Sequence, residues 1–214
     1  MGVVLAHLPE IGGGLLVTLE LTVLAFAGAL VLGTIVAVFR ISPLPPLRAL
    51  GLAYVEVFRN IPLLMLLVLI AFGLPEAGLK LSLFASATVG MGMYAAAYVC
   101  EAIRSGVQTI GAGQVEAARA IGLTFGQVLR HVVLPQAFRS MAQPLGNIFI
   151  AVALGTSLSA SIGLMDLTGV TRLLNVAYAE PIATFAAAAV CYVLITLSGG
   201  LLTGAVERRA RILR

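Results

Sequence analysis

The sequence predicts an all-α membrane protein with five transmembrane helices. Of its 214 residues, 60% are hydrophobic and 10% are charged, whereas an ordinary soluble domain carries roughly a quarter charged residues. The apolar residues are gathered in stretches of about 20 or more, which is the length a helix needs to cross roughly 30 Å of hydrocarbon. Transmembrane strands are excluded because the alternating pattern of a barrel is missing and an open sheet cannot satisfy its backbone in lipid.

Arginine and proline mark the breaks between these stretches. Arg40 and the SPLPP run at 42–46 follow the first stretch, and Pro75, Pro135 and Pro181 separate the others. No soluble domain, linker or internal repeat interrupts the pattern, so residues 1–214 are expected to form one transmembrane domain. The expected spans cover residues 15–39, 52–72, 81–102, 138–160 and 181–206.

Basic residues give the expected orientation. The net charge of +4 arises from 13 basic and 9 acidic residues. Because the arginines are scattered between apolar spans, they are typical of a topology signal and not of a nucleic-acid-binding surface. Only Lys80 and Arg172 fall on the side opposite the arginine-rich segments, so the positive-inside bias places the amino terminus outside and the carboxyl terminus in the cytoplasm. The segments 40–50, 103–141 and 207–214 hold ten arginines, namely Arg40, Arg48, Arg104, Arg119, Arg130, Arg139, Arg208, Arg209, Arg211 and Arg214.

The longest cytoplasmic segment, 103–141, carries helix signals. Residues 114–121 are rich in alanine, and Gly122 stands where a helix end favours a left-handed residue. Thr124 and Gln127 have the spacing of a capping box, and apolar residues follow at helical spacing from Phe125. Proline cannot continue a helical ladder, so Leu134-Pro135 is expected to end the second helix. The segment therefore predicts a helix, a glycine break, an amphipathic helix across the membrane face and a proline stop.

The run GQVEAARAIGLTFGQVLRHVVLP within this segment resembles the EAA loop of importer permeases of the ATP-binding-cassette class. The resemblance implies a coupling segment at about 112–136 that docks in a groove of a cytoplasmic ATPase. Small alanines permit close approach, a glutamate near a helix start is favoured by the dipole, and glycine permits the turn. From these properties alone, an interfacial amphipathic helix without a partner fits about equally well. The residues that match the motif are Glu116, Ala117, Ala118, Gly122, Val132 (where isoleucine is usual), Leu134 and Pro135.

Three further segments resemble polar amino-acid permeases of the histidine, glutamine and glutamate family. They are YVEVFRNIPLLMLL from Tyr54, AAYVCEAIRSGVQTI before Gln114 and TSLSASIG from Thr156. The resemblance covers residues 18–207 and is greatest to actinobacterial glutamate permeases. Many relatives have Lys-Asn where this chain has Leu154-Gly155, which leaves the amino acid open.

The resemblance also implies partners and a location. The chain is expected to work with a second permease subunit, identical or homologous, with two ATPase subunits that bind ATP and Mg, and with an extracytoplasmic substrate-binding protein. It would reside in the cytoplasmic membrane of a bacterium and move an amino acid by alternating access. ATP hydrolysis would belong to the partner subunit, so the chain itself is not expected to be an enzyme or to bind a cofactor.

Polar groups inside the expected spans are candidates for a substrate pathway, because ionisable groups at membrane depth are costly. Glu56 with Arg59, and Glu101 with Arg104, are three residues apart, so local ion pairs also explain them. Asp166 is placed near a substrate ammonium group or, alternatively, is a solvated loop residue. The candidates for the pathway are Arg59, Glu101, Asn147, Thr156, Ser157 and Asp166; the hydroxyl and amide groups among them are equally well explained by helix packing.

No catalytic or metal-ligating residue is expected. The two histidines, His7 and His131, stand beside no convincing nucleophile or metal cluster. Two other classes of function remain open from the residues: a passive channel or secondary transporter, and a structural membrane scaffold. A channel or secondary transporter would need no cytoplasmic docking helix and would more often place paired charges near the bilayer midplane. A scaffold would use the expected helix from Phe125 to Val133 as an anchor for lipid or for a partner.

Overall fold

The computed structural model describes residues 2–210, and every regular element in that range is a helix, as the sequence predicts. In chain order the elements are α1 (Gly2–Ala6), α2 (Leu8–Ile41), α3 (Pro45–Asn60), α4 (Leu63–Val68), the π-helix η1 (Leu69–Gly73), α5 (Leu74–Glu76), α6 (Leu83–Gln108), α7 (Ala112–Ala120), α8 (Phe125–Val128), the π-helix η2 (Leu129–Val133), α9 (Leu134–Gly155), the 3₁₀-helix η3 (Thr156–Ile162), α10 (Leu167–Tyr178) and α11 (Pro181–Ala210).

Within the part of the chain that the structure describes, four helical segments are long and apolar enough to cross a membrane: Leu8–Ile41, Leu83–Gln108, Phe125–Ile162 and Pro181–Ala205. The expected second span is not one straight helix, because α3 and the segment Leu63–Glu76 meet at an angle of 104°. Pro62 causes this break: the residue before a proline avoids the helical region, and Ile61 is extended with ψ 133°. Five spans result only if this bent pair is counted as one.

The core forms where α2 packs against α6. Small residues let the two backbones approach closely: a Cβ on Gly33 of α2 would lie 2.7 Å from both the Ala96 carbonyl oxygen and the Val99 Cβ of α6. Ala25 and Ala29 are fully buried in the same cluster. A hydroxyl also ties the helices to the rest of the fold, since Leu167 at the start of α10 donates its N–H to Thr18 Oγ1 of α2 at 3.1 Å.

Pro135 does not end the helix that precedes it, so the expected proline stop is wrong. A proline lacks an N–H and clashes with the carbonyl one turn earlier, and the chain absorbs both effects by widening to a π-helix over Leu129–Val133 before α9 begins. The same device occurs at Leu69–Gly73 before Pro75. Residues 125–133 are therefore continuous with the long span that follows them.

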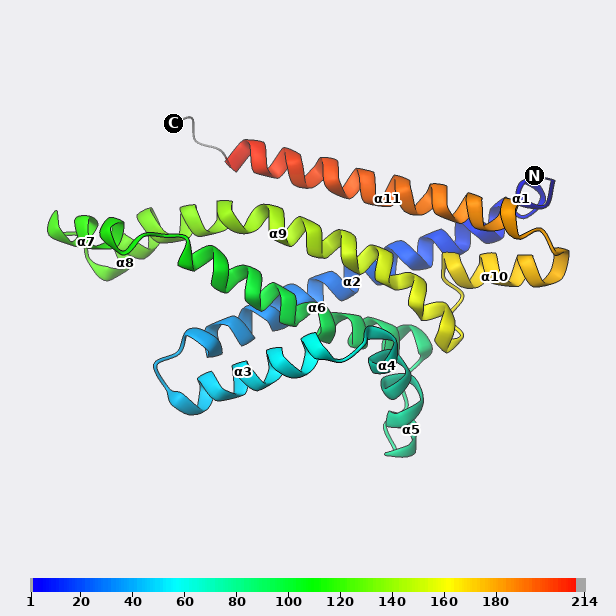
Figure 1. The fold of residues 1–214 in the computed structure, drawn as a ribbon, viewed down its shortest axis with the longest axis horizontal. Helices are drawn as coiled ribbons and strands as arrows, with labels where there is room; N and C mark the ends of the chain where they lie inside the picture. Colours follow the sequence, from blue (N-terminus) through cyan, green and yellow to red (C-terminus); the bar gives the residue numbers. More distant parts are fainter. Residues whose placement is uncertain (1, 211–214) are drawn as a thin grey trace.

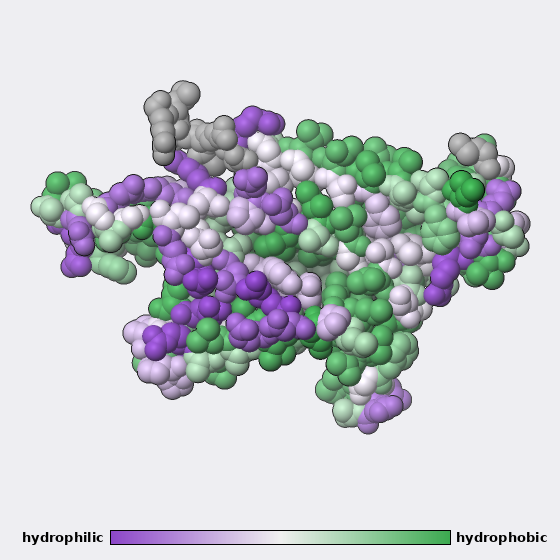
Figure 2. Space-filling model, in the orientation of Figure 1, coloured by the Kyte–Doolittle hydropathy of each residue, from purple (hydrophilic) through white to green (hydrophobic). Residues whose placement is uncertain are grey.

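The helices α2, α6, α9 and α11 run along the long axis of the molecule (Figure 1). Most of the turns and short helices that connect them therefore lie at one or the other end of this axis. One end carries the turn between α2 and α3 together with α7 and α8, and hydrophilic residues gather toward it (Figure 2). We call this the basic end, because its helices and turns carry Arg40, Arg48, Arg104, Arg119, Arg130, Arg139 and Arg208. The opposite end carries α1 and α10, the latter a helix that the sequence pattern did not predict. Arg211, Arg214 and the side chain of Arg209, which entered the expected orientation, lie outside the described residues.

Candidate functional site

The segment that resembles a coupling loop folds as a helical hairpin at the basic end. Gly122 makes the turn with φ +87°, as the sequence predicts. The turn closes by two backbone bonds, from Gly122 N–H to the Arg119 carbonyl at 3.0 Å and from Leu123 N–H to the Ala118 carbonyl at 3.2 Å. A residue with a side chain would be strained at this φ, so glycine fixes where α7 ends and the chain reverses.

The second helix of the hairpin begins at the predicted capping box. Thr124 N–H donates to Gln127 Oε1 at 2.9 Å, and Gln127 N–H donates to Thr124 Oγ1 at 3.4 Å. Two backbone donors that a helix start leaves unpaired are thereby satisfied. The turn and the box together hold the hairpin tip in one conformation.

The hairpin has a packed inner face and an exposed outer face. Ala118 and Val128 are buried where α7 packs against α8 and η2, whereas Glu116 and Ala117 are exposed. Ile121 is 79% exposed and Phe125 is 77% exposed. We call Glu116, Ala117, Ile121 and Phe125 the docking surface. We did not predict Ile121 as part of this surface from the sequence, although apolar residues before and after a glycine turn are a pattern that can be recognised.

The remaining motif residues lie at the base of the hairpin. Val132 belongs to the π-helix η2, and Leu134 and Pro135 begin α9. The Val132 carbonyl accepts a hydrogen bond from the Gln136 side chain at 2.9 Å. These residues shape the join between hairpin and span and stand apart from the exposed tip.

A groove of about 350 Å³ opens between α4, α6 and α9. Tyr94 and Tyr98 of α6 line it, and their hydroxyls lie 3.0 Å apart. Of the candidate pathway residues, only Asn147 lines this groove. The other lining residues are Leu63, Met91, Ala95, Ile148, Ala151 and Val152. Apolar walls with a few hydroxyl and amide groups are the usual composition of a small-molecule site.

Arg59 reaches the edge of the groove from α3. Its guanidinium carbon lies 5.7 Å from the centroid of the Tyr98 ring, within the range of a cation–π interaction. The expected ion pair between Glu56 and Arg59 is absent from the described residues: Glu56 instead accepts from Asn60 Nδ2 at 3.4 Å. The Arg59 guanidinium therefore faces the ring of Tyr98, and its N–H donors remain available to bind an anion.

Glu101 binds two arginines at the basic end. The expected pair is confirmed, since Arg104 Nη2 donates to Glu101 Oε2 at 2.8 Å. Arg40 of α2 adds a second bond, from its Nη1 to Glu101 Oε1 at 2.7 Å. Charge-assisted bonds of this kind are the stronger ones in proteins. Glu101 thus locks α2 to α6 and does not line the groove between α4, α6 and α9.

The last three candidates lie beyond the groove. The hydroxyls of Thr156 and Ser157 each donate to a backbone carbonyl three residues earlier, at 2.7 Å. Asp166, expected in a solvated loop, is fully buried, which corrects that expectation. It begins α10, where its Oδ1 accepts from Gly169 N–H at 2.9 Å. Burial raises the pKa of the Asp166 carboxyl above its ordinary value, although hydrogen bonds from Gly169 and other donors oppose the shift.

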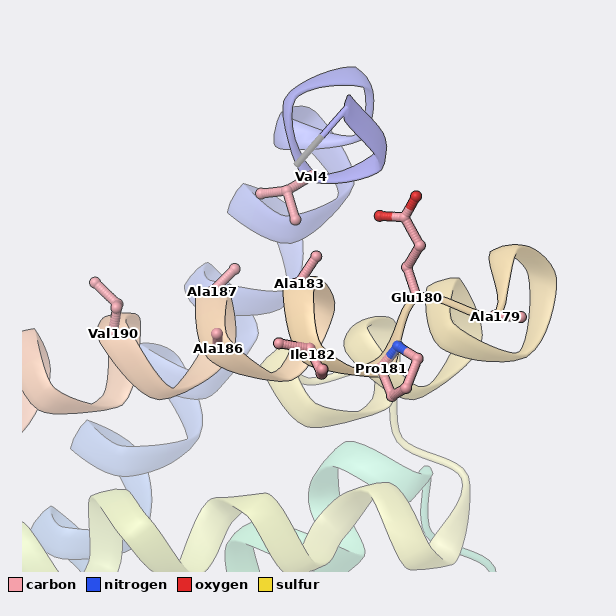
Figure 3. A pocket seen from close by; sticks show the side chains of 9 residues that line it. All are labelled: Val4, Ala179, Glu180, Pro181, Ile182, Ala183, Ala186, Ala187 and Val190. Carbon is pink, nitrogen blue, oxygen red and sulfur yellow. The ribbon is translucent and has the colours of Figure 1, made fainter.

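A second hollow of about 590 Å³ lies at the end opposite the hairpin. Val4 of α1 faces Ala183 and Ala187 of α11 across it, and Glu180 stands beside it (Figure 3). None of the candidate residues lines this hollow. Its alanine-rich wall offers packing surface and little chemistry. Among the side chains that the structure describes, no three His, Cys, Asp or Glu residues come together as metal ligands do.

Known proteins share both the sequence and the fold. The chain is 39% identical over 192 residues to the probable glutamine ABC transporter permease protein GlnM of Bacillus subtilis, covering 90% of this chain and 89% of that protein. It is 34% identical over 209 residues to the glutamate transport system permease protein GluC of Corynebacterium glutamicum, covering 92% of each. The crystal structure of an amino acid ABC transporter with histidines superposes with a TM-score of 0.90 at 32% identity and covers 96% of each chain.

These similarities confirm the resemblance inferred from the motifs to importer permeases of the ATP-binding-cassette class. The match to a family model is consistent with it and extends over residues 29–212, which include the hairpin, the groove and the Glu101 cluster. The chain belongs to the family of binding-protein-dependent transport system inner membrane components.

Proposed function

We propose that this chain is the permease subunit of an ABC importer for a polar amino acid. The observation that carries the proposal is the similarity over about nine-tenths of the chain to permeases named for glutamine and glutamate. The solved structure that superposes with a TM-score of 0.90 is likewise that of an amino acid transporter. Glutamine and glutamate are the first candidates, and the Leu154-Gly155 pair gives no reason to choose between them.

The docking surface is the proposed contact with an ATPase subunit. Glu116 and Ala117 lie exposed on α7, and the highly exposed Ile121 and Phe125 extend the surface over the tip. A surface with an apolar centre and a charged residue beside it is typical of a protein–protein interface. ATP and Mg would bind on that partner. Because η2 joins the hairpin to α9 without a break, movement of the tip would be passed to a helix that lines the groove.

The groove between α4, α6 and α9 is the proposed part of the substrate pathway. Asn147 and the tyrosine hydroxyls offer hydrogen bonds to an amino acid, and Arg59 offers a cation for its carboxylate. Thr156 and Ser157 follow at the far end of α9, with their hydroxyls bonded to backbone. Glu101 and Asp166 take a structural part in this proposal, holding α2 to α6 and starting α10.

The proposed orientation places the basic end in the cytoplasm and the amino terminus outside. Support comes from the seven arginines with described side chains that lie at the end of the hairpin, whereas Lys80 and Arg172 lie in the loop after α5 and on α10. The hairpin would then face the cytoplasmic ATPase. A second permease subunit and an extracytoplasmic binding protein complete the proposed assembly, because one chain with this few spans does not easily enclose a passage.

Uptake into sealed vesicles tests the proposal. The chain is reconstituted with its ATPase and binding protein, and ATP-dependent accumulation of labelled L-glutamine, L-glutamate, L-aspartate and L-arginine is measured. Accumulation of at least one, weakened by Arg59→Gln or Asn147→Ala and unchanged by Lys80→Gln, is expected. Accumulation that persists without ATP, or none of these amino acids moving in vesicles whose ATPase is active, contradicts it.

A further inference from the structure

We propose that the basic end carries a binding site for the headgroup of an anionic phospholipid. A pocket of about 350 Å³ opens there between α2, α3 and α6. Three arginines line it, Arg40, Arg48 and Arg104, one from each helix. The remaining lining is Ile41, Leu52, Val107 and Gln108. The pocket is distinct from the groove proposed for the substrate, and the two share no lining residue.

The pocket carries an excess of positive charge. Glu101 compensates Arg40 and Arg104 with one carboxylate, through bonds of 2.7 and 2.8 Å. Arg48 forms no ion pair with any residue that the structure describes. Glu56, the next acidic residue on α3, lies about 12 Å further along the helix and accepts from Asn60. Three guanidinium groups facing one pocket with a single carboxylate between them leave donors and charge for a phosphate.

The depth of the pocket fits a headgroup. α2 has 34 residues, so at about 1.5 Å per residue it is longer than the roughly 30 Å hydrocarbon layer. Arg40 stands in its last turn, directly after the apolar stretch. The position therefore falls at the level where lipid phosphates lie, and basic pockets between transmembrane helices at that level are suited to anionic headgroups.

The surroundings favour a lipid over a free phosphate ion. Ile41 is 58% exposed and Leu52 is 41% exposed, and both line the pocket. Leu44 lies in the turn between α2 and α3 and is 57% exposed. Leu50 lies on α3, like Leu52, and is 61% exposed. A phospholipid whose phosphate is held by the arginines would place its acyl chains against these exposed apolar side chains, and the burial of those side chains is favourable.

Native mass spectrometry of the full chain in detergent tests this site. Phosphatidylglycerol and phosphatidylcholine are titrated separately, and inorganic phosphate is tested as a competitor. Arg48→Gln removes an exposed charge without breaking the Glu101 bonds, and Arg48→Lys keeps the charge. Arg172→Gln, an exposed arginine on α10 at the other end, is the matched control.

Phosphatidylglycerol is expected to bind more tightly than phosphatidylcholine, and Arg48→Gln to weaken it about fivefold, which is what one arginine near a membrane surface contributes. Arg48→Lys and Arg172→Gln should retain most of the binding. Equal binding of both lipids, or equal weakening by Arg48→Gln and Arg172→Gln, overturns the proposal. Displacement of the lipid by phosphate at equal concentration assigns the site to a free anion and also overturns it.

Discussion

Arg40 and Glu101 lie 61 residues apart in the sequence and meet through a 2.7 Å hydrogen bond from Nη1 to Oε1. The bond joins the last turn of α2 to α6, and along α2 it follows the close helix contact at Gly33. Arg104 occupies the other carboxylate oxygen. One acidic side chain therefore fixes the helix pair at the same end as the hairpin.

Replacing Glu101 with glutamine should destabilise the protein. Arg40 and Arg104 have side chains that are 13% and 31% exposed, so they would be left as partly buried cations with a weaker partner. We expect a loss of about 2 kcal/mol, seen as a lower unfolding temperature in detergent. Glu56→Gln is the control, because Glu56 lies exposed on α3; equal losses from the two changes would argue against the Glu101 cluster.

A side chain at Gly146 should separate α9 from α11. A Cβ at this position would lie 2.7 Å from Thr203 Cβ and nearer still to its terminal atoms. Gly146→Ala is expected to cost about 1–3 kcal/mol through overpacking. Gly200→Ala, where nothing lies within 4 Å of the new Cβ, should be neutral or slightly stabilising. Unchanged thermal stability of Gly146→Ala would show that the two helices do not pack as described.

Gly122→Ala should strain the hairpin turn. At φ +87° an alanine costs about 1–2 kcal/mol relative to glycine, and asparagine is expected to be tolerated better. Protease cleavage within residues 111–128 should become faster in Gly122→Ala and change little in Gly113→Ala, where the backbone is helical and the space is open. Equal cleavage rates in both variants would contradict the left-handed turn.

Asp166 should make stability depend on pH in a defined direction. Its folded-state pKa is raised by burial, so between the ordinary value of 3.8 and the raised value the folded chain binds more protons than the unfolded chain. Stability attributable to this group therefore falls as pH rises through that window.

Asp166→Asn keeps the oxygen that caps Gly169 N–H and removes the titration. The stability of the native chain relative to this variant should decline as the pH rises above 3.8, the ordinary pKa of the carboxyl, measured by thermal unfolding in detergent. Glu76→Gln, an exposed carboxylate on α5, is the control. A difference that grows with rising pH would mean that the carboxylate is favoured in its charged form.

Local features of the fold were predictable from the sequence because their physics is local. The left-handed Gly122, the Thr124 and Gln127 capping box and the Glu101 and Arg104 pair each depend on residues within a few positions of one another. The long apolar spans followed from composition. The EAA-like run gave the family correctly because several specified positions coincide within a short segment.

Other features required the tertiary structure. The π-helices η1 and η2 let the chain pass through Pro75 and Pro135, an outcome decided by packing of the segments that follow. From the sequence, Asp166 is expected to be a loop residue. In the structure it begins α10, whose first residue, Leu167, is hydrogen-bonded to Thr18 of α2. The contact between Arg40 and Glu101 joins distant spans, and no pattern in one sequence pairs them.

Retention of the partner ATPase tests the central claim most directly. The chain is co-expressed with its ATPase and purified intact, with Glu116→Arg on the docking surface, or with Glu76→Arg as the charge-reversed control on α5. We predict that the ATPase co-purifies with the intact chain and with Glu76→Arg and is lost with Glu116→Arg, because a reversed charge at an interface opposes docking. Equal retention by all three, or no retention by a folded and monodisperse intact chain, would contradict the account.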